Sequence, residues 1–163
     1  MRETNNMRGS LTLQLSDRDG EVVHQAHYKN RIVTSGRSLV AQMFAGQAGG
    51  VPAGKVTHMA LGSDATAPSD ADTALNAERA PRKAITSVDY SEVSEGAPGS
   101  EVKRVRARLT AVFDFGDANG ATALREAGIF TADTGGVMYN RVVFDPVTKT
   151  DAFKLTLLWD IVF

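Results

Sequence analysis

The sequence predicts a mainly β fold: an antiparallel β-sandwich, or a barrel-like pair of sheets, with one short packed α-helix. The strongest observation is that apolar and polar residues alternate through residues 101–115 and again through residues 153–163. A period of two is typical of a strand that buries one face. In addition, strand-like runs recur at roughly ten-residue spacing with Gly, Asn and Asp turns between them, which is typical of sandwiches. Repeated βα units do not occur, which argues against a Rossmann-type sheet.

The N-terminal part of the chain predicts a hairpin. Residues 11–16 alternate Leu with polar residues, a D-x-D-G turn follows at residues 17–20, and residues 21–29 form the returning strand. The two acidic residues of the turn also have the spacing of a calcium loop. However, Tyr28 stands where the last position of such a loop needs a glutamate, so we interpret the segment as a turn.

One helix is predicted, from residue 34 to about residue 45. Thr34 or Ser35 can cap its start, and Gly46 is a natural stop. A helix of about three turns is not stable alone and must pack on another element. Its apolar stripe is therefore expected to lie in the core against a sheet; the stripe consists of Leu39, Val40, Met43 and Phe44.

The remaining strands are short, and polar segments connect them. Strands are predicted at residues 55–61, 83–90, 127–131 and 137–144. Turns are predicted at residues 116–120, 134–136 and 145–146. The connection 62–81 is expected to be an ordered surface loop in which Asp72 can cap a single turn through Glu78. We expect contacts between subunits at the connections 48–55 and 91–100, both of which contain Gly and Pro.

Most aromatic residues lie in the C-terminal part of the chain, where eight of the 11 fall between Phe113 and Phe163. On the two long alternating segments they occupy the apolar faces. We therefore expect them to form the central core of the sandwich and not an aromatic binding site. These residues are Phe113, Phe115, Phe153, Trp159 and Phe163.

The composition predicts a single globular domain over residues 1–163, with 42% hydrophobic and 23% charged residues. A net charge of −1 argues against a general nucleic-acid binder. The absence of cysteine excludes disulfides and thiolate chemistry. The N-terminus shows no signal-peptide h-region, and no apolar stretch approaches the length of a membrane span. We expect a protein that is made in a cytoplasm, is not exported by a signal peptide and has no membrane partner.

Residues with catalytic or metal-binding potential form no recognisable motif. His24 and His27 are expected on opposite faces of a strand, which argues against a two-histidine metal site, although His58 stays an alternative third ligand. Neither a G-x-S-x-G elbow nor a phosphate-binding loop occurs. The carboxylates that a glycosidase could pair are interpreted as solvated loop residues or caps; they are Asp64, Asp70, Asp72, Glu78 and Glu126. We expect no enzyme activity, no cofactor and no metal.

A basic cluster lies on and before the strand at residues 101–115. Three interpretations stay open: a solvated face that protects a sheet edge, an interface with acidic residues of a neighbouring protein, and contact with nucleic acid. The last has the least support, because no aromatic residues interleave the arginines. Arg104, Arg106 and Arg108 share one face and are candidate interface residues. The cluster also contains Arg79, Arg82, Lys83 and Lys103.

Arg141, Leu158 and Val162 are further candidate interface residues. Arg141 lies among apolar neighbours in a predicted strand, so it either pairs with an acidic residue or is exposed. Glu126 is a candidate partner, from the same chain or from a neighbour. Leu158 and Val162 lie on the otherwise polar face of the last strand. Apolar residues on both faces are typical of a central strand or of a surface that another subunit covers.

Several short motifs, in this order and spacing, resemble a family of tailed-phage proteins: the tail-fibre, collar-fibre and baseplate-associated proteins, also found in phage-like injection particles. The family pattern joins a strand that ends in "ALG" to "TAP", "DTAL", a Glu and Arg-Lys, and later shows "E-x-G-[IL]-F", "M-x-x-R-x-x-F" and a close of the form "L-x-x-x-W-x-I-x-F". The matching segments here are NRIVTSGRSLVAQMFAG (30–46), VTHMALGSDATAP (56–68), ADTAL (71–75) with Glu78 and Arg82-Lys83, EAGIF (126–130), MYNRVVF (138–144), and Lys149 with LTLLWDIVF (155–163).

This resemblance implies a non-enzymatic structural subunit of a tailed-phage or phage-derived injection particle, in the tail, collar, neck or baseplate. Such a subunit acts as an adaptor or fibre-attachment protein, with other virion proteins as partners. It forms a homo-oligomer, in a symmetric ring or trimer, and ends in the virion after assembly in the host cytoplasm. The alternatives are a carbohydrate- or receptor-binding module of a tail fibre, or a capsid decoration protein. A carbohydrate site would need an exposed aromatic residue over a groove, such as Tyr90 or Tyr139.

Overall fold

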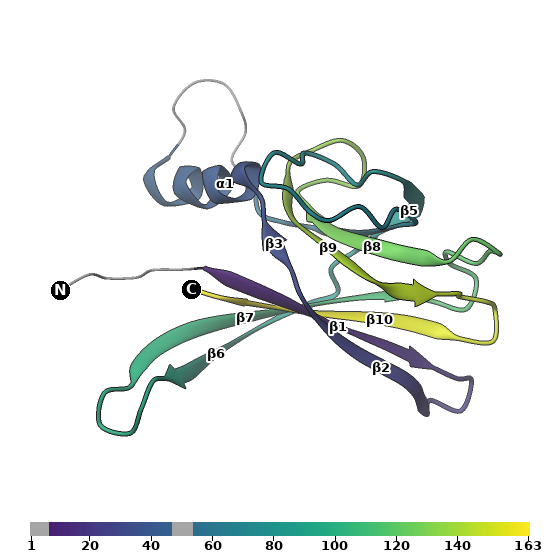
Figure 1. Ribbon diagram of the computed structural model, residues 1–163, viewed down its shortest axis with the longest axis horizontal. Helices are drawn as coiled ribbons and strands as arrows, with labels where there is room; N and C mark the ends of the chain where they lie inside the picture. Colours follow the sequence, from purple (N-terminus) through teal and green to yellow (C-terminus); the bar gives the residue numbers. More distant parts are fainter. Residues whose placement is uncertain (1–6, 47–53) are drawn as a thin grey trace.

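The computed structural model describes residues 7–46 and 54–163, which fold into two five-stranded antiparallel sheets and one α-helix (Figure 1). The first sheet has the order β2 (Val22–Lys29), β1 (Arg8–Ser16), β10 (Lys154–Val162), β7 (Val102–Phe113) and β6 (Ser87–Glu95). The second has the order β3 (Arg31–Ile32), β9 (Met138–Val147), β8 (Leu124–Phe130), β4 (His58–Gly62) and β5 (Glu78–Ala84). The helix α1 (Thr34–Ala45) follows β3. The sheets pack as a sandwich, as the sequence predicts, and they do not close into a barrel.

The core lies between the two sheets and is built from alternate residues of the long strands. On β10 the inward residues Leu155, Leu157, Trp159 and Ile161 are buried, and the residues between them are half-buried. The Trp159 indole Nε1 donates a hydrogen bond to Asn30 Oδ1 at 2.8 Å, which satisfies its polar group. The buried side chains of β1, β7, β8 and β9 complete the same cluster.

The predicted aromatic core is only partly correct. Phe113 and Trp159 are fully buried, but Phe163 is 39% exposed. Phe115 and Phe153 lie just outside the strands and are half-buried. The strands therefore bury their aromatic residues only where the opposite sheet covers them.

Two edge strands begin or end inside segments that the sequence predicts differently. β5 begins in the last four residues of the predicted loop 62–81, and β6 extends to Glu95 into the predicted connection 91–100. The single strand predicted at residues 83–90 is divided between β5 and β6, which belong to different sheets. No helical turn forms between Asp72 and Glu78. An edge strand pairs on one side only, and β5 and β6 bury few of their side chains, so the side-chain pattern does not fix where they begin and end. For the same reason β5 tolerates Pro81, which cannot donate to a ladder.

The last strand of the second sheet is also longer than predicted. β9 runs through the Asp-Pro pair at residues 145–146, where the sequence indicates a turn, and ends at Val147. Val147 pairs with Leu124 beyond an irregularity in the register. The pairing with β8 therefore continues past the proline and keeps this segment extended.

The helix has the predicted bounds, but only part of its apolar stripe is core. Leu39 is buried and Val40 is half-buried, whereas Met43 is 55% and Phe44 94% exposed. The cause is visible in Figure 1, where α1 starts beside the second sheet and its C-terminal end points away from that sheet. The predicted cap is also wrong: the N-cap residue is Val33, which makes no side-chain cap.

Close contact with β9 holds the start of the helix in place. The Ser35 hydroxyl donates to the Met138 carbonyl at 2.7 Å. Gly36 packs directly against the Tyr139 carbonyl, and a Cβ at this position would collide with that oxygen. The helix therefore begins on the sheet and ends beyond it. No helix in the described ranges is long and apolar enough to cross a membrane.

Candidate functional site

Arg141 lies at the centre of a buried network of charged groups on the second sheet. Its side chain has no exposed surface, and its Nε donates to Glu126 Oε2 at 2.8 Å. The Nη1 and Nη2 groups donate to Asp72 Oδ2 at 3.0 Å and to Asp64 Oδ1 at 3.2 Å. The partner that the sequence predicts, Glu126, is therefore correct and belongs to the same chain. Asp64 and Asp72, which sequence reasoning interprets as loop carboxylates or caps, complete the network.

Glu126 also binds the loop between β4 and β5. Its carboxylate accepts the backbone N–H groups of Ala77 at 2.7 Å, Asn76 at 3.2 Å and Asp64 at 3.4 Å. A Cβ at Gly62 would collide with this carboxylate, so a glycine is needed where β4 ends. The network fixes the whole connection 63–77 against the sheet.

The hydrogen bonds and ion pairs of the network favour the charged forms of Arg141 and Asp64. Burial alone would lower the pKa of Arg141, but hydrogen bonds and charge attraction from Glu126 and Asp72 raise it. The pKa of Asp64 is lowered by hydrogen bonds from the Asn76 amide and from the Thr66 N–H. This network of ion pairs and hydrogen bonds anchors the loop to the second sheet.

The other candidate interface residues lie together on the outer face of the first sheet. Arg108 forms a bidentate pair with Asp160 at 2.8 and 2.7 Å, and the Asp160 hydrogen bond raises the pKa of Arg108. Arg106 Nε donates to Ser91 Oγ at 3.1 Å, and Arg104 lies 3.8 Å from Glu95. Each of these arginines thus contacts an acidic or polar group of the same chain.

Leu158 and Val162 lie half-buried on this same outer face. They belong to β10, which is the central strand of the first sheet. Apolar residues on both faces of this strand are therefore explained by its central position in the sheet. Arg141 alone among the candidate interface residues lies in the other sheet, without exposed surface.

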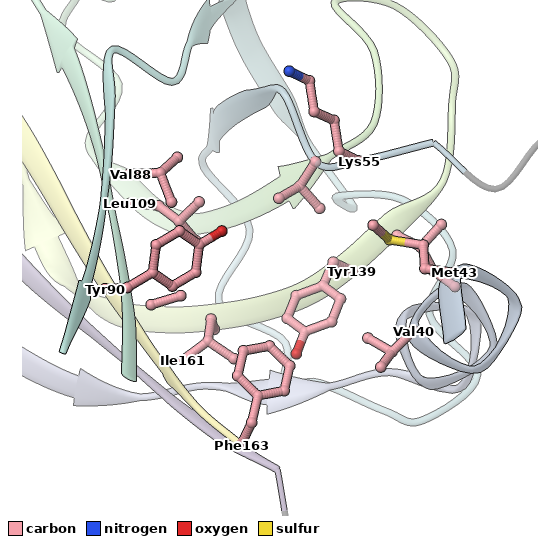
Figure 2. A pocket seen from close by; sticks show the side chains of 12 residues that line it. Val40, Met43, Lys55, Val88, Tyr90, Leu109, Tyr139, Ile161 and Phe163 are labelled. Atoms are coloured by element: carbon pink, nitrogen blue, oxygen red, sulfur yellow. The ribbon is translucent and has the colours of Figure 1, made fainter. Parts of the chain in front are cut away.

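An apolar cleft lies between α1 and the inner face of the first sheet, and it is the candidate functional site (Figure 2). Its volume is about 240 Å³. The helix contributes Val40 and Met43, and the strands contribute Val88 and Tyr90 from β6 and Ile161 from β10. The remaining lining residues are Leu39, Lys55, Val56, Ala107, Leu109, Tyr139 and Phe163.

The cleft exists because the first sheet extends beyond the second. Along the inner face of β7 the exposed fraction falls from 48% at Val105 to 7% at Ala107 and zero at Phe113. Figure 1 shows the hairpin of β6 and β7 projecting away from the second sheet at this end. On β6, Val88 and Tyr90 pair with the inward residues of β7 but remain 44% and 74% exposed. An apolar sheet face is thus left uncovered beside the end of the helix.

One polar group in the wall of the cleft has no partner among the described residues, the hydroxyl of Tyr139. Tyr139 is 4% exposed, and Figure 2 shows its hydroxyl directed between Phe163 and Val40. Burial raises the pKa of Tyr139 to about 12. A buried phenol keeps its proton and usually finds an acceptor. The cleft therefore combines apolar walls with one unused hydrogen-bond donor.

Sequence reasoning missed the cleft, although weak signals were present. Met43 and Phe44 continue the apolar stripe of the helix, and Val88 and Tyr90 lie on one face of β6. The sequence does not show whether another segment covers these residues. Of the connections expected to carry contacts, residues 48–53 lie outside the described residues, while Lys55 lines the cleft. The connection after β6, residues 96–100, is exposed.

The histidines of the chain form no site in the structure. His24 and His27 both lie on β2, and His27 Nδ1 is 3.0 Å from Thr12 Oγ1. His58 Nδ1 is 2.8 Å from Thr57 Oγ1. Within residues 7–46 and 54–163 no group of three His, Cys, Asp or Glu side chains is arranged to hold a metal ion. These side chains therefore add nothing to the candidate site.

Comparison of the chain with family models, with curated proteins and with solved structures found no match.

Proposed function

We propose that the chain is a non-enzymatic structural subunit of a tailed-phage or phage-derived injection particle. It works through contacts with other protein subunits, as an adaptor or fibre-attachment protein in the tail, collar, neck or baseplate. The observation that carries the proposal is the uncovered apolar inner face of the first sheet beside α1. Contiguous exposed apolar surface of this kind marks interaction sites. In an assembled particle, a neighbouring subunit would bury this apolar surface.

The positions of the resembling motifs support the proposal. "ALG", "DTAL", "E-x-G" and the arginine of "M-x-x-R" lie far apart in the sequence, but Gly62, Asp72 and Glu126 from these motifs meet around Arg141. The resemblance thus covers residues that contact one another in the fold.

A glycan-binding module is the second candidate, and Tyr90 is the observation that favours it. Its ring is 74% exposed at the cleft, where a sugar could stack. A sugar also needs several polar groups for its hydroxyls. The lining offers only the Lys55 ammonium and the hydroxyls of Tyr90 and Tyr139 as polar side-chain groups. The nearly apolar lining fits apolar side chains of a protein better, so we place glycan binding second.

The test is to locate the chain in particles. Phage or injection particles are isolated from the organism that encodes the chain and purified by density, and their peptides are quantified by mass spectrometry. We expect a fixed copy number of this chain per particle. If the chain stays in the lysate while complete particles lack it, the proposal is wrong. Binding of the purified chain to a glycan array that is lost on Tyr90→Ala would favour the second candidate instead.

A further inference from the structure

We propose that the apolar cleft receives Phe44 of a second copy of this chain. This inference rests on the proposed function, because it names the partner of the same site. The two halves of the contact are present on each chain: an apolar cleft beside the end of α1, and an aromatic side chain on the last turn of that helix. The smallest assembly that joins them is a dimer.

Phe44 is the most exposed of the large apolar side chains, with 94% of its surface accessible. It follows Met43, which lines the cleft, and lies one turn beyond Val40, which lines it too. Exposing a whole phenyl ring forgoes the free energy that its burial would contribute. With 3.6 residues per turn, Phe44 lies on nearly the same side of α1 as Val40, one turn farther along, and its exposure makes it accessible to another molecule.

The cleft has the size and chemistry for one aromatic ring. An apolar cavity of about 150 Å³ is enough to hold benzene, and the cleft measures about 240 Å³. The walls that would contact the ring are Val40, Val88, Ile161 and Phe163.

Placement on the molecule allows reciprocal contact. Figure 1 shows the C-terminal end of α1 and the hairpin of β6 and β7 at the same end of the molecule, so a two-fold axis near this end would bring the helix end of each copy to the hairpin of the other. A two-fold contact closes on itself and uses the same patch on both partners. Each copy then covers the exposed inner face of the other.

The absence of cysteine from the sequence permits a direct test by disulfide cross-linking. Chains with Phe44→Cys are mixed with chains carrying Tyr90→Cys, and the mixture is oxidised and digested for mass spectrometry. The matched control replaces Tyr90→Cys with Val23→Cys, since Val23 is 51% exposed but lies on β2 near the opposite end of the first sheet. We expect the peptide pair joining residues 44 and 90 to exceed the control pair. Equal yields overturn the proposal.

The mass in solution gives an independent reading. Light scattering of the unmodified chain should show two or more copies of the 17.4 kDa chain. Phe44→Ser should reduce this to one copy, whereas Val23→Ser should not. A single copy in the unmodified chain, or an unchanged mass in Phe44→Ser, overturns the proposal. Cross-links from position 90 only to a different protein, or an apolar small molecule retained by a monomer, also overturn it.

The two proposals can fail separately. A chain that is counted in particles but is monomeric and forms no 44–90 cross-link refutes the exchange of Phe44 and leaves the structural role standing. If the chain forms a dimer with the expected cross-link but is absent from complete particles, the structural role is refuted and the exchange of Phe44 stands.

Discussion

Replacement of Glu126 by Gln should destabilise the fold strongly, although the two side chains have nearly the same shape. Glu126 has no exposed surface, and its two oxygens accept from Arg141 and from backbone N–H groups of the connection 63–77. A glutamine keeps one acceptor oxygen but brings an NH₂ group to a place surrounded by donors. At least one N–H of the loop, or the guanidinium, then loses its partner.

The magnitude follows from the surroundings of the pair. Removing one partner of a buried ion pair costs about 3–5 kcal/mol, because the other charge is left uncompensated. Here Asp72 and Asp64 still face Arg141 at 3.0 and 3.2 Å, which partly replaces the lost charge. We therefore expect a loss of about 3 kcal/mol in the free energy of unfolding, the lower end of that range. This is a large part of the ~5–15 kcal/mol that stabilises an ordinary domain.

The assay is urea unfolding followed by the fluorescence of Trp159, the only tryptophan, which is fully buried. Asp70→Asn is the matched control, because it removes a carboxylate that pairs with Arg31 at 2.9 Å on the surface. The control should leave the midpoint nearly unchanged. A loss below about 1 kcal/mol for Glu126→Gln would place the network with ordinary surface pairs and refute the anchoring role.

Two more predictions concern the core and the cleft. Trp159→Ala should cost ~3–5 kcal/mol, measured by urea unfolding with far-ultraviolet circular dichroism, and a shift well under 1 kcal/mol would show that the indole is not core. In an absorbance titration of the phenols, the folded chain should show a tyrosine that ionises at about 12, and Tyr139→Phe should remove that step. Because the pKa of Tyr139 is raised above its ordinary value of 10.0, its contribution to stability is complete below pH 10 and is lost as the pH rises through 12. A titration unchanged in Tyr139→Phe would contradict this assignment.

The sandwich and its helix could be predicted from the sequence because their signals are local. The alternation along β7 and β10 is long enough to identify the strands and their buried faces, and Gly46 lies just after the observed end of α1. The edge strands β5 and β6 were placed less well. Few of their side chains are buried, so backbone pairing with the neighbouring strand decides their length, and pairing leaves little trace in side-chain pattern.

The site was predictable only in part. The need of a buried Arg141 for an acidic partner follows from the cost of an unpaired charge, and Glu126 was a candidate. The sequence left open whether Arg141 is buried and which chain supplies the partner, and the structure decides both. The participation of Asp64 and Asp72 depends on how the connection after β4 returns across the sheet, and no local pattern states this. For the outer face of the first sheet, sequence reasoning grouped the arginines correctly but could not see that Asp160 and Glu95 lie beside them.

The sequence by itself determined the long strands β1, β7 and β10 and their apolar faces, because side-chain period depends only on the geometry of one strand or one helix. Only the tertiary structure decided which apolar faces are covered. Phe113 and Val105 occupy the same face of β7, yet one is fully buried and the other 48% exposed. Phe44 belongs to the same stripe as Leu39 and is almost wholly exposed. Coverage depends on how far the opposite sheet extends, which is a relation between distant segments, and this mismatch in length leaves the cleft that we propose a second copy fills.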